Sequence, residues 1–93
     1  MATYTLDGSR IHSRDQFWQE YVAVVQPEGA EHFGRNLDAF NDALWGGPGW
    51  PGNDFTLRIL HSEHLTETLG ADFIASFRES CGDSARAKLE MLR

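Results

Sequence analysis

The sequence has few cysteines, few basic residues and no long hydrophobic run, and each shortage excludes a class of protein. Cys81 is the only cysteine among 93 residues, so no internal disulfide can form and a disulfide-rich secreted scaffold is excluded. No stretch approaches the roughly 20 apolar residues of a membrane span. The N-terminal residues also lack the basic and apolar regions of a signal peptide. We therefore expect a cytoplasmic protein that does not bind a membrane.

The shortage of basic residues bears on the partner. Eight Lys and Arg residues stand against 14 Asp and Glu residues, which gives a formal net charge of −6. Such a surface repels phosphate backbones, so we expect no direct binding to nucleic acid. It attracts a basic protein over long distances. The alternative that the charge only keeps a small protein in solution remains open.

Most motifs of catalysis and cofactor binding are missing. The sequence has no Gly-rich phosphate loop, no G-x-S-x-G turn and no Cys/His zinc pattern. His61 and His64 flank Glu63, but they lack the i, i+4 spacing of helical ligands and an obvious third ligand. We therefore expect no metal, no cofactor and no enzymatic activity. A small enzyme or metal protein built on these three residues is the weakest alternative.

Hydrophobic periodicity predicts strands that alternate with helices. In chain order, the expected elements are a strand at 3–6, helices at about 13–26 and 34–45, a strand at 55–60, helices at 62–69 and 71–80, and a strand in the tail at 86–92. The tail is ambiguous, because its residues are strong helix formers although its apolar residues alternate with charged ones. A strand there completes an α/β fold with a small three-stranded parallel sheet packed against three to four helices. We expect a single domain over residues 1–93.

The segment 45–52 is too dense in Gly and Pro to form a helix or a strand. It nevertheless carries two tryptophans, Trp45 and Trp50. They either serve as exposed anchors for a partner or fold back onto the core, and the sequence leaves both alternatives open.

The predicted short helix at 34–45 separates apolar and acidic residues. Asn36 is a plausible N-cap, and Asp38 and Asp42 lie four positions apart on one face. Nearly opposite them runs an apolar stripe that consists of Phe33, Leu37, Phe40 and Leu44. Two like charges at this spacing cost a few tenths of a kcal/mol, about 0.2–0.5. Stability alone would not select them, so the face is either an acidic interaction surface or merely solvated.

Residues 33–44 resemble the motif of the barstar family, intracellular inhibitors of ribonucleases. The family pattern is an aromatic residue, Gly, any residue, Asn-Leu-Asp-Ala, two variable positions, Asp, a small residue and Leu, and every fixed element is present here. A second likeness is Phe77-Arg78-Glu79. The resemblance implies a barstar-like α/β fold. It also implies a stoichiometric inhibitor that blocks the active site of a secreted microbial ribonuclease with its motif helix and the preceding loop.

By position, the resemblance assigns roles to individual residues. Asp42 would take the place of a substrate phosphate, with Asp38 as a supporting carboxylate and Glu79 as a further acidic contact. The complete set of expected partner-binding residues is His32, Phe33, Gly34, Asn36, Leu37, Asp38, Asn41, Asp42, Trp45, Gly46 and Glu79.

The chain departs from the family at two of these positions. The family often has an aromatic residue where this chain has Asn41, and a tyrosine where it has His32. The Gly/Pro/Trp segment is also longer, and Trp45 or Trp50 would replace the missing aromatic contacts. A protein of the same fold that binds a different basic partner is the main alternative.

Overall fold

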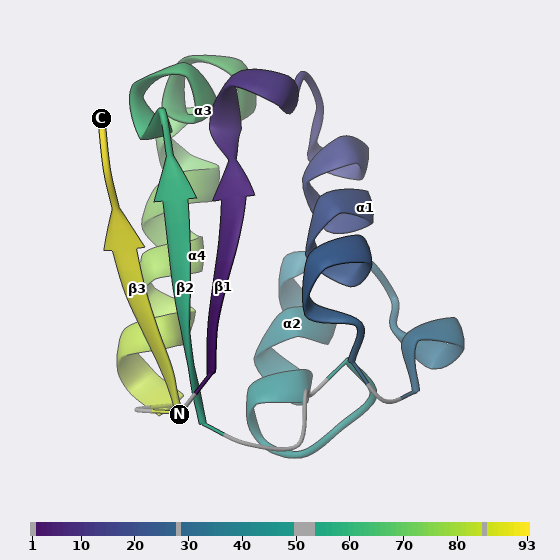
Figure 1. Cartoon of the computed structure of the whole chain (residues 1–93). Helices are drawn as coiled ribbons and strands as arrows, with labels where there is room; N and C mark the ends of the chain where they lie inside the picture. Colours follow the sequence, from purple (N-terminus) through teal and green to yellow (C-terminus); the bar gives the residue numbers. More distant parts are fainter. Residues whose placement is uncertain (1, 28, 50–53, 85) are drawn as a thin grey trace.

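The computed structural model describes residues 2–27, 29–49, 54–84 and 86–93 (Figure 1). Within these ranges, three strands, four α-helices and two short 3-10 helices follow one another. Their bounds are β1 (Ala2–Asp7), η1 (Gly8–Arg10), α1 (Arg14–Val25), η2 (Ala30–His32), α2 (Leu37–Leu44), β2 (Phe55–Leu60), α3 (Ser62–Leu69), α4 (Ala71–Ser84) and β3 (Ala87–Met91).

The three strands form a parallel sheet in the order β1-β2-β3. Both crossovers step in the same direction along the sheet, the first through α1 and α2 and the second through α3 and α4. Because parallel crossovers share one handedness, two steps in the same direction bring their helices to the same face. In Figure 1, α4 lies behind the sheet, α3 lies at its upper end, and α1 and α2 lie to the right of β1. The expected α/β fold is therefore present.

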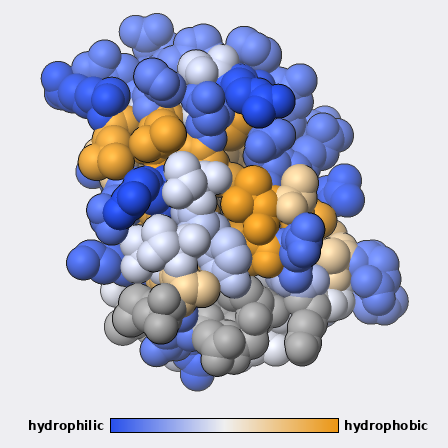
Figure 2. All heavy atoms as spheres, viewed as in Figure 1, coloured by the Kyte–Doolittle hydropathy of each residue, from blue (hydrophilic) through white to orange (hydrophobic). Residues whose placement is uncertain are grey.

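The two faces of the sheet differ in character. On the helix side, Leu6, Leu57 and Ile59 are completely buried. On the other side, Thr3 and Thr5 of β1 are exposed to solvent. In the space-filling view of this side, pale and hydrophilic atoms cover the centre, and hydrophobic atoms lie above them and to their right (Figure 2). Because one face of the sheet is covered by helices and the other is exposed to solvent, apolar and polar residues alternate along β1. This alternation identified the strand in the sequence.

Several element bounds differ from those expected. The third strand is confirmed, because pairing with β2 outweighs the helix propensity of its residues. The helix expected at 34–45 begins only at Leu37, since Arg35 is left-handed at φ 54° and Asn36 is extended. The helix expected at 71–80 continues to Ser84. Cys81 extends its buried face by one more turn, which offsets the cost of about 1 kcal/mol for Gly82 within a helix.

Ser13 and Gln16 have the S-x-x-Q spacing of a capping box, and the start of α1 follows this pattern with one change. The Ser13 side chain accepts a hydrogen bond from the Gln16 amide at 3.1 Å, as an N-cap does. The Gln16 side chain, however, accepts from the amide of His12 at 2.7 Å and not from that of Ser13. At its other end, α1 stops at Gln26, which is left-handed at φ 50° and precedes Pro27.

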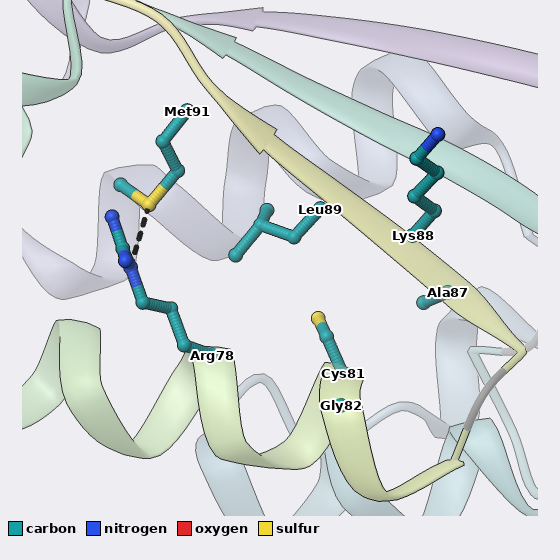
Figure 3. A pocket seen from close by; sticks show the side chains of 7 residues that line it. All are labelled: Arg78, Cys81, Gly82, Ala87, Lys88, Leu89 and Met91. Atoms are coloured by element: carbon teal, nitrogen blue, oxygen red, sulfur yellow. Dashed lines mark hydrogen bonds between the residues drawn. The ribbon is translucent and has the colours of Figure 1, made fainter.

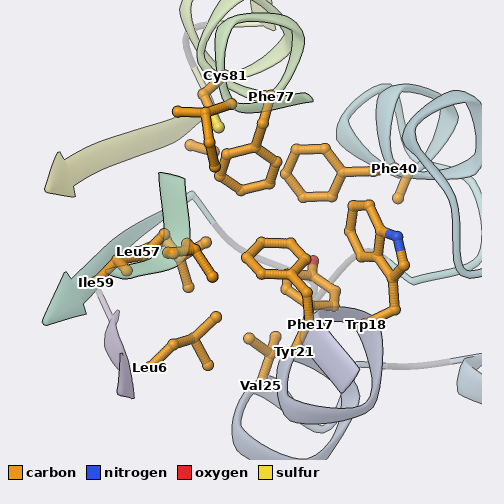
Figure 4. Packing of buried hydrophobic residues seen from close by; sticks show 14 of the residues in the cluster. Leu6, Phe17, Trp18, Tyr21, Val25, Phe40, Leu57, Ile59, Phe77 and Cys81 are labelled. Carbon is orange, nitrogen blue, oxygen red and sulfur yellow. The ribbon is translucent and has the colours of Figure 1, made fainter. Parts of the chain in front are cut away.

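A cluster of aromatic rings forms the centre of the core between α1, α2 and α4 (Figure 4). The Phe40 ring stacks on Phe77, with 4.8 Å between centroids, and its centroid lies 5.6 Å from that of Trp18. Edge-to-face contacts connect Phe17 to Trp18 at 4.8 Å. These geometries favour aromatic packing beyond the area that they bury. The cluster therefore holds the three helices together.

The loop after α2 is attached to this core by a buried hydrogen bond. The Tyr21 hydroxyl donates to the carbonyl oxygen of Gly49 at 3.0 Å. Burial raises the pKa of Tyr21, so the hydroxyl keeps the proton that it donates. Gly49 has a φ of +100°, and a Cβ there would lie 2.6 Å from the Phe33 ring. This end of the loop therefore folds back onto the core, whereas Trp50 lies outside the described residues.

Two further properties bear on the expectations from composition. Cys81 is only 3% exposed, and burial raises the pKa of its thiol to about 12. A protonated, buried thiol is a poor nucleophile, which agrees with a structural role. Of the helices in the described ranges, none has both the length and the apolar character needed to cross a membrane.

The Tyr21 hydrogen bond generates a prediction about stability. Replacing Tyr21 by Phe leaves the Gly49 carbonyl without its donor in a buried place, so we expect a loss of about 1–3 kcal/mol in the free energy of unfolding. Chemical denaturation measures this loss. Tyr4→Phe is the matched control and should change stability by less than about 0.5 kcal/mol. Equal effects of the two substitutions would contradict the anchoring role of Tyr21.

Candidate functional site

Three residues of the motif build the turn that starts α2. The Asn36 side-chain oxygen accepts from the Ala39 amide at 2.8 Å, and its Nδ2 donates to the Gly34 carbonyl at 3.2 Å. A Cβ on Gly34 would lie 3.1 Å from the Ala39 side chain. Gly34, Asn36 and Ala39 therefore fit together as one unit. The Asn36 amide is used within the chain, which gives it a structural role whatever it contacts in a complex.

The buried side of this segment consists of the apolar residues that the sequence indicated. Phe40 and Leu44 of α2 are completely buried. Phe33 is 6% exposed and packs against Trp18 and Tyr21, but it precedes α2 and is not part of the helix. Leu37 is only partly buried and lies at the edge of the stripe. The stripe thus fixes which side of α2 faces the core.

The opposite side of α2 exposes Asp38, Asn41 and Asp42 to solvent. Asp38 lies in the first turn, where the helix dipole favours a negative charge, and Asp42 lies one turn further along the same face. Within the described ranges, neither aspartate forms an ion pair with a basic side chain. Both carboxylates are therefore available to positive groups of another molecule.

Glu79 of α4 joins the acidic face. A hollow of about 390 Å³ lies between α2 and α4, and Asp38, Asn41 and Glu79 line it together with Leu37, Ser76 and Ser80. Glu79 is exposed and, like the two aspartates, has no ion-pair partner in the part of the chain that the structure describes. Two carboxylates from different helices therefore meet at one depression, which suits a cationic side chain.

A second hollow shares two lining residues with the first. Leu37 and Asp38 line it as well, and its volume is also about 390 Å³. Its remaining lining residues are Arg14, Asp15, Trp18, Arg35, Asn36 and Phe73. Arg14 is held in place, since it donates to the Leu69 carbonyl at 3.1 Å and lies over the Phe73 ring. Leu37 and Asp38 thus project between two depressions.

The end of α2 explains one expected contact and leaves another exposed. Gly46 has a φ of +100°, and its amide donates to the Ala43 carbonyl at 2.9 Å, so a glycine suits this helix end. Trp45 is 60% exposed, with the Arg86 guanidinium 6.0 Å from its ring centroid. Of the two alternatives for Trp45, the exposed position is the one that the structure has.

His32 ends η2 and is exposed on the approach to the motif. Its Nε2 lies 3.7 Å from the Glu31 carboxylate, and both side chains are about three-quarters in solvent. Such an exposed pair contributes little to stability. His32 is therefore an available surface residue near the acidic face.

The alternative metal site has little support from the geometry. His61 is the left-handed residue before α3, and the His64 ring packs edge-on against His12 at 5.5 Å. The His64 Nε2 also lies 3.4 Å from the Thr68 hydroxyl. Among the described residues, no group of three or more potential ligands is close enough to hold a metal ion.

Two residues that line the hollow between α2 and α4 were not predicted from the sequence. Ser76 and Ser80 are four positions apart on α4, with Glu79 between them, which is the spacing of one helix face. That signal is present in the sequence. The sequence does not say, however, that this face of α4 lies beside α2, because that depends on packing between helices.

The fold and this surface together define a small α/β protein that exposes a carboxylate-bearing helix. The family model described as Barstar (barnase inhibitor) matches residues 1–91, and the chain belongs to this family. The match covers nearly the whole chain and not only the motif helix. A search of curated proteins found no match.

The turn before α2 yields a second prediction. Asn36→Ala removes the N-cap and releases the Gly34 carbonyl, so we expect stability to fall by about 1 kcal/mol, within the 0.5–2 kcal/mol range of lost caps. Asn41→Ala is the control, because Asn41 is exposed within α2 and Ala is the better helix former. Denaturant unfolding of both variants measures the difference. If Asn41→Ala destabilises as much as Asn36→Ala, the cap does not explain the asparagine of the motif.

Proposed function

We propose that this protein is a proteinaceous inhibitor of a secreted microbial ribonuclease and acts inside the cell as one barstar-like domain. The observation that carries the proposal is the acidic face: Asp38, Asp42 and Glu79 are exposed and unpaired within the described residues of a barstar-family chain. The description of this family as barnase inhibitors supports the class of partner. The protein would bind one ribonuclease molecule and perform no chemistry itself.

Asp42 is the residue that we assign to the centre of the complex. A carboxylate presents two oxygen acceptors, as a phosphate does, and pairs well with the guanidinium groups that a ribonuclease uses to bind its substrate. The α2 backbone that carries Asp42 is held by the burial of Phe40 and Leu44. Little conformational freedom would therefore be lost on binding, which favours affinity.

The hollow between α2 and α4 supports a second contact. Asp38 and Glu79 line it from two sides, and the two serines beside them leave space for a long side chain. A single arginine or lysine of the ribonuclease would meet both carboxylates there. Leu37, at the start of α2, and the preceding turn at Gly34 and Asn36 would contact the enzyme beside this hollow.

The remaining proposed contacts concern the positions where this chain departs from the family pattern. His32 and Asn41 are both exposed and smaller than the aromatic residues common there. Trp45 is exposed one helical turn beyond Asn41. We assign to Trp45 the aromatic contact that His32 and Asn41 lack, and to Gly46 the close approach beside it.

Inhibition assays test the proposed function directly. The protein is titrated into a panel of secreted microbial ribonucleases, and residual activity is followed at low and high salt. We expect stoichiometric inhibition of at least one enzyme and slower association at high salt, because the net charge of −6 attracts a basic enzyme. Failure to inhibit any enzyme, together with capture of a basic protein of another kind, would favour the alternative of a different partner.

Asp42 gives the third prediction. Asp42→Ala should weaken binding to the inhibited ribonuclease by at least about 2 kcal/mol, or roughly 30-fold, if Asp42 is a hot spot that faces buried cations. Inhibition constants measured at fixed salt give this value. Glu67→Ala removes the same charge from α3 and serves as the control, with an expected change of less than about threefold. An Asp42→Ala protein that inhibits as well as the parent would refute the assignment.

The shared hollow gives the fourth prediction. Asp38→Asn and Glu79→Gln should each weaken inhibition, and the double variant should lose less than the sum of the two, because both carboxylates would face one cation. We expect a coupling of about 0.5–3 kcal/mol between residues that share a partner group. The control cycle combines Asp38→Asn with Glu67→Gln, whose effects should add. Additive losses for Asp38 and Glu79 would mean that they meet separate groups.

A further inference from the structure

Strand β3 lies at an edge of the sheet. It pairs with β2 on one side, and no described strand lies on its other side. In Figure 1 it is the leftmost strand of the sheet, with the C-terminus at its upper end. An edge of this kind offers backbone donors and acceptors to a further strand.

The hydrogen bonds at the two ends of β3 show which of its residues turn outward. The Phe55 amide donates to the Arg86 carbonyl at 3.0 Å. The Leu92 amide donates to the Ile59 carbonyl at 2.8 Å. Residues 86 and 92 therefore point their backbone groups toward β2, and so do the even-numbered residues between them, since these directions alternate along a strand. The residues whose amides and carbonyls point to the open edge are Ala87, Leu89 and Met91.

The geometry points to a second copy of this chain as the partner of that edge. We infer that two β3 strands pair antiparallel about a twofold axis at Leu89 and join the two three-stranded sheets into one. Leu89 then faces Leu89 of the second copy, and Ala87 faces Met91 of the second copy. All three are outward-pointing residues, so these are the pairs that exchange backbone hydrogen bonds in an antiparallel ladder.

The side chains on the open face of the sheet select this register. With the axis at Leu89, Lys88 lies opposite Glu90 of the second copy, and the symmetry makes this pair twice. Such non-hydrogen-bonded pairs bring their side chains close, where opposite charges are favourable. Glu90 already lies 3.7 Å from Arg58 on β2, so positive and negative groups would alternate across the joined sheet. An axis at Ala87 would instead oppose Lys88 with Arg86.

The helix side of the same edge is incompletely filled. A groove of about 650 Å³ runs between α4 and β3, lined by Arg78, Cys81, Gly82, Ala87, Lys88, Leu89 and Met91 (Figure 3). Leu89 and Met91 are only partly buried, and Arg78 reaches across to donate its Nε–H to the Met91 sulfur at 3.2 Å. Leu89 and Met91 of a second copy would cover this apolar surface, and small Ala87 would face the larger Met91.

Sedimentation equilibrium and hydrogen exchange test this pairing. A five-residue edge buries little area, so we expect a weak dimer that forms between about 10 µM and 1 mM protein. Over that range, the outward amides of Ala87, Leu89 and Met91 should become protected from exchange as concentration rises. A protein that stays monomeric at about 1 mM, or amides that exchange equally fast at all concentrations, would overturn the proposal.

Charge reversal tests the register. Lys88→Glu places two glutamates opposite each other at both symmetric positions, so we expect the dissociation constant of the dimer to rise about tenfold. The double variant with Lys88→Glu and Glu90→Lys should recover the affinity, and the Lys88→Glu and Glu90→Lys single variants should associate with each other better than with themselves. Arg10→Glu changes the net charge equally on another surface and is the control. Loss of affinity in Lys88→Glu no greater than in the control would overturn the register.

Discussion

The packing of Phe40 is the interaction on which the functional surface depends. Its ring lies between Phe77 of α4 and Trp18 of α1, so one residue of a short helix contacts both neighbouring helices. An eight-residue helix has little stability of its own and needs such tertiary contacts. Because the helical period is fixed, burying Phe40 and Leu44 turns Asp38 and Asp42 outward. The exposed acidic face is thus a consequence of the core.

The motif of the family divides physically into residues that build the helix and residues that it presents. Gly34, Asn36 and Ala39 fit against one another and set where α2 begins. The side chains of Asp38 and Asp42, in contrast, form no ion pair with a basic group in the described ranges. A preorganised binding surface requires a rigid helix start and two carboxylates that are free of internal ion pairs.

The molecule also distributes its charge unevenly. The acidic residues of the proposed inhibitory face lie on α2 and α4, whereas Arg78, Arg86 and Lys88 gather around the start and groove side of β3. The proposed pairing of β3 uses a set of residues separate from the carboxylates that would meet a ribonuclease. A dimer formed through β3 would keep Asp38, Asp42 and Glu79 of each copy outside the strand pairing.

The sequence by itself determined the order of strands and helices, the apolar stripe of α2 and the family motif, because these depend on local periodicity, capping and residue identity. It predicted that α2 begins too early, because the start of α2 depends on the left-handed backbone of Arg35. It also predicted that α4 ends too early, because the last turn of α4 depends on the burial of Cys81. Only the tertiary structure brought Glu79 beside Asp38 and left Trp45 exposed. Those positions follow from how α2 packs on α4, a contact between segments about 40 residues apart that no local pattern encodes.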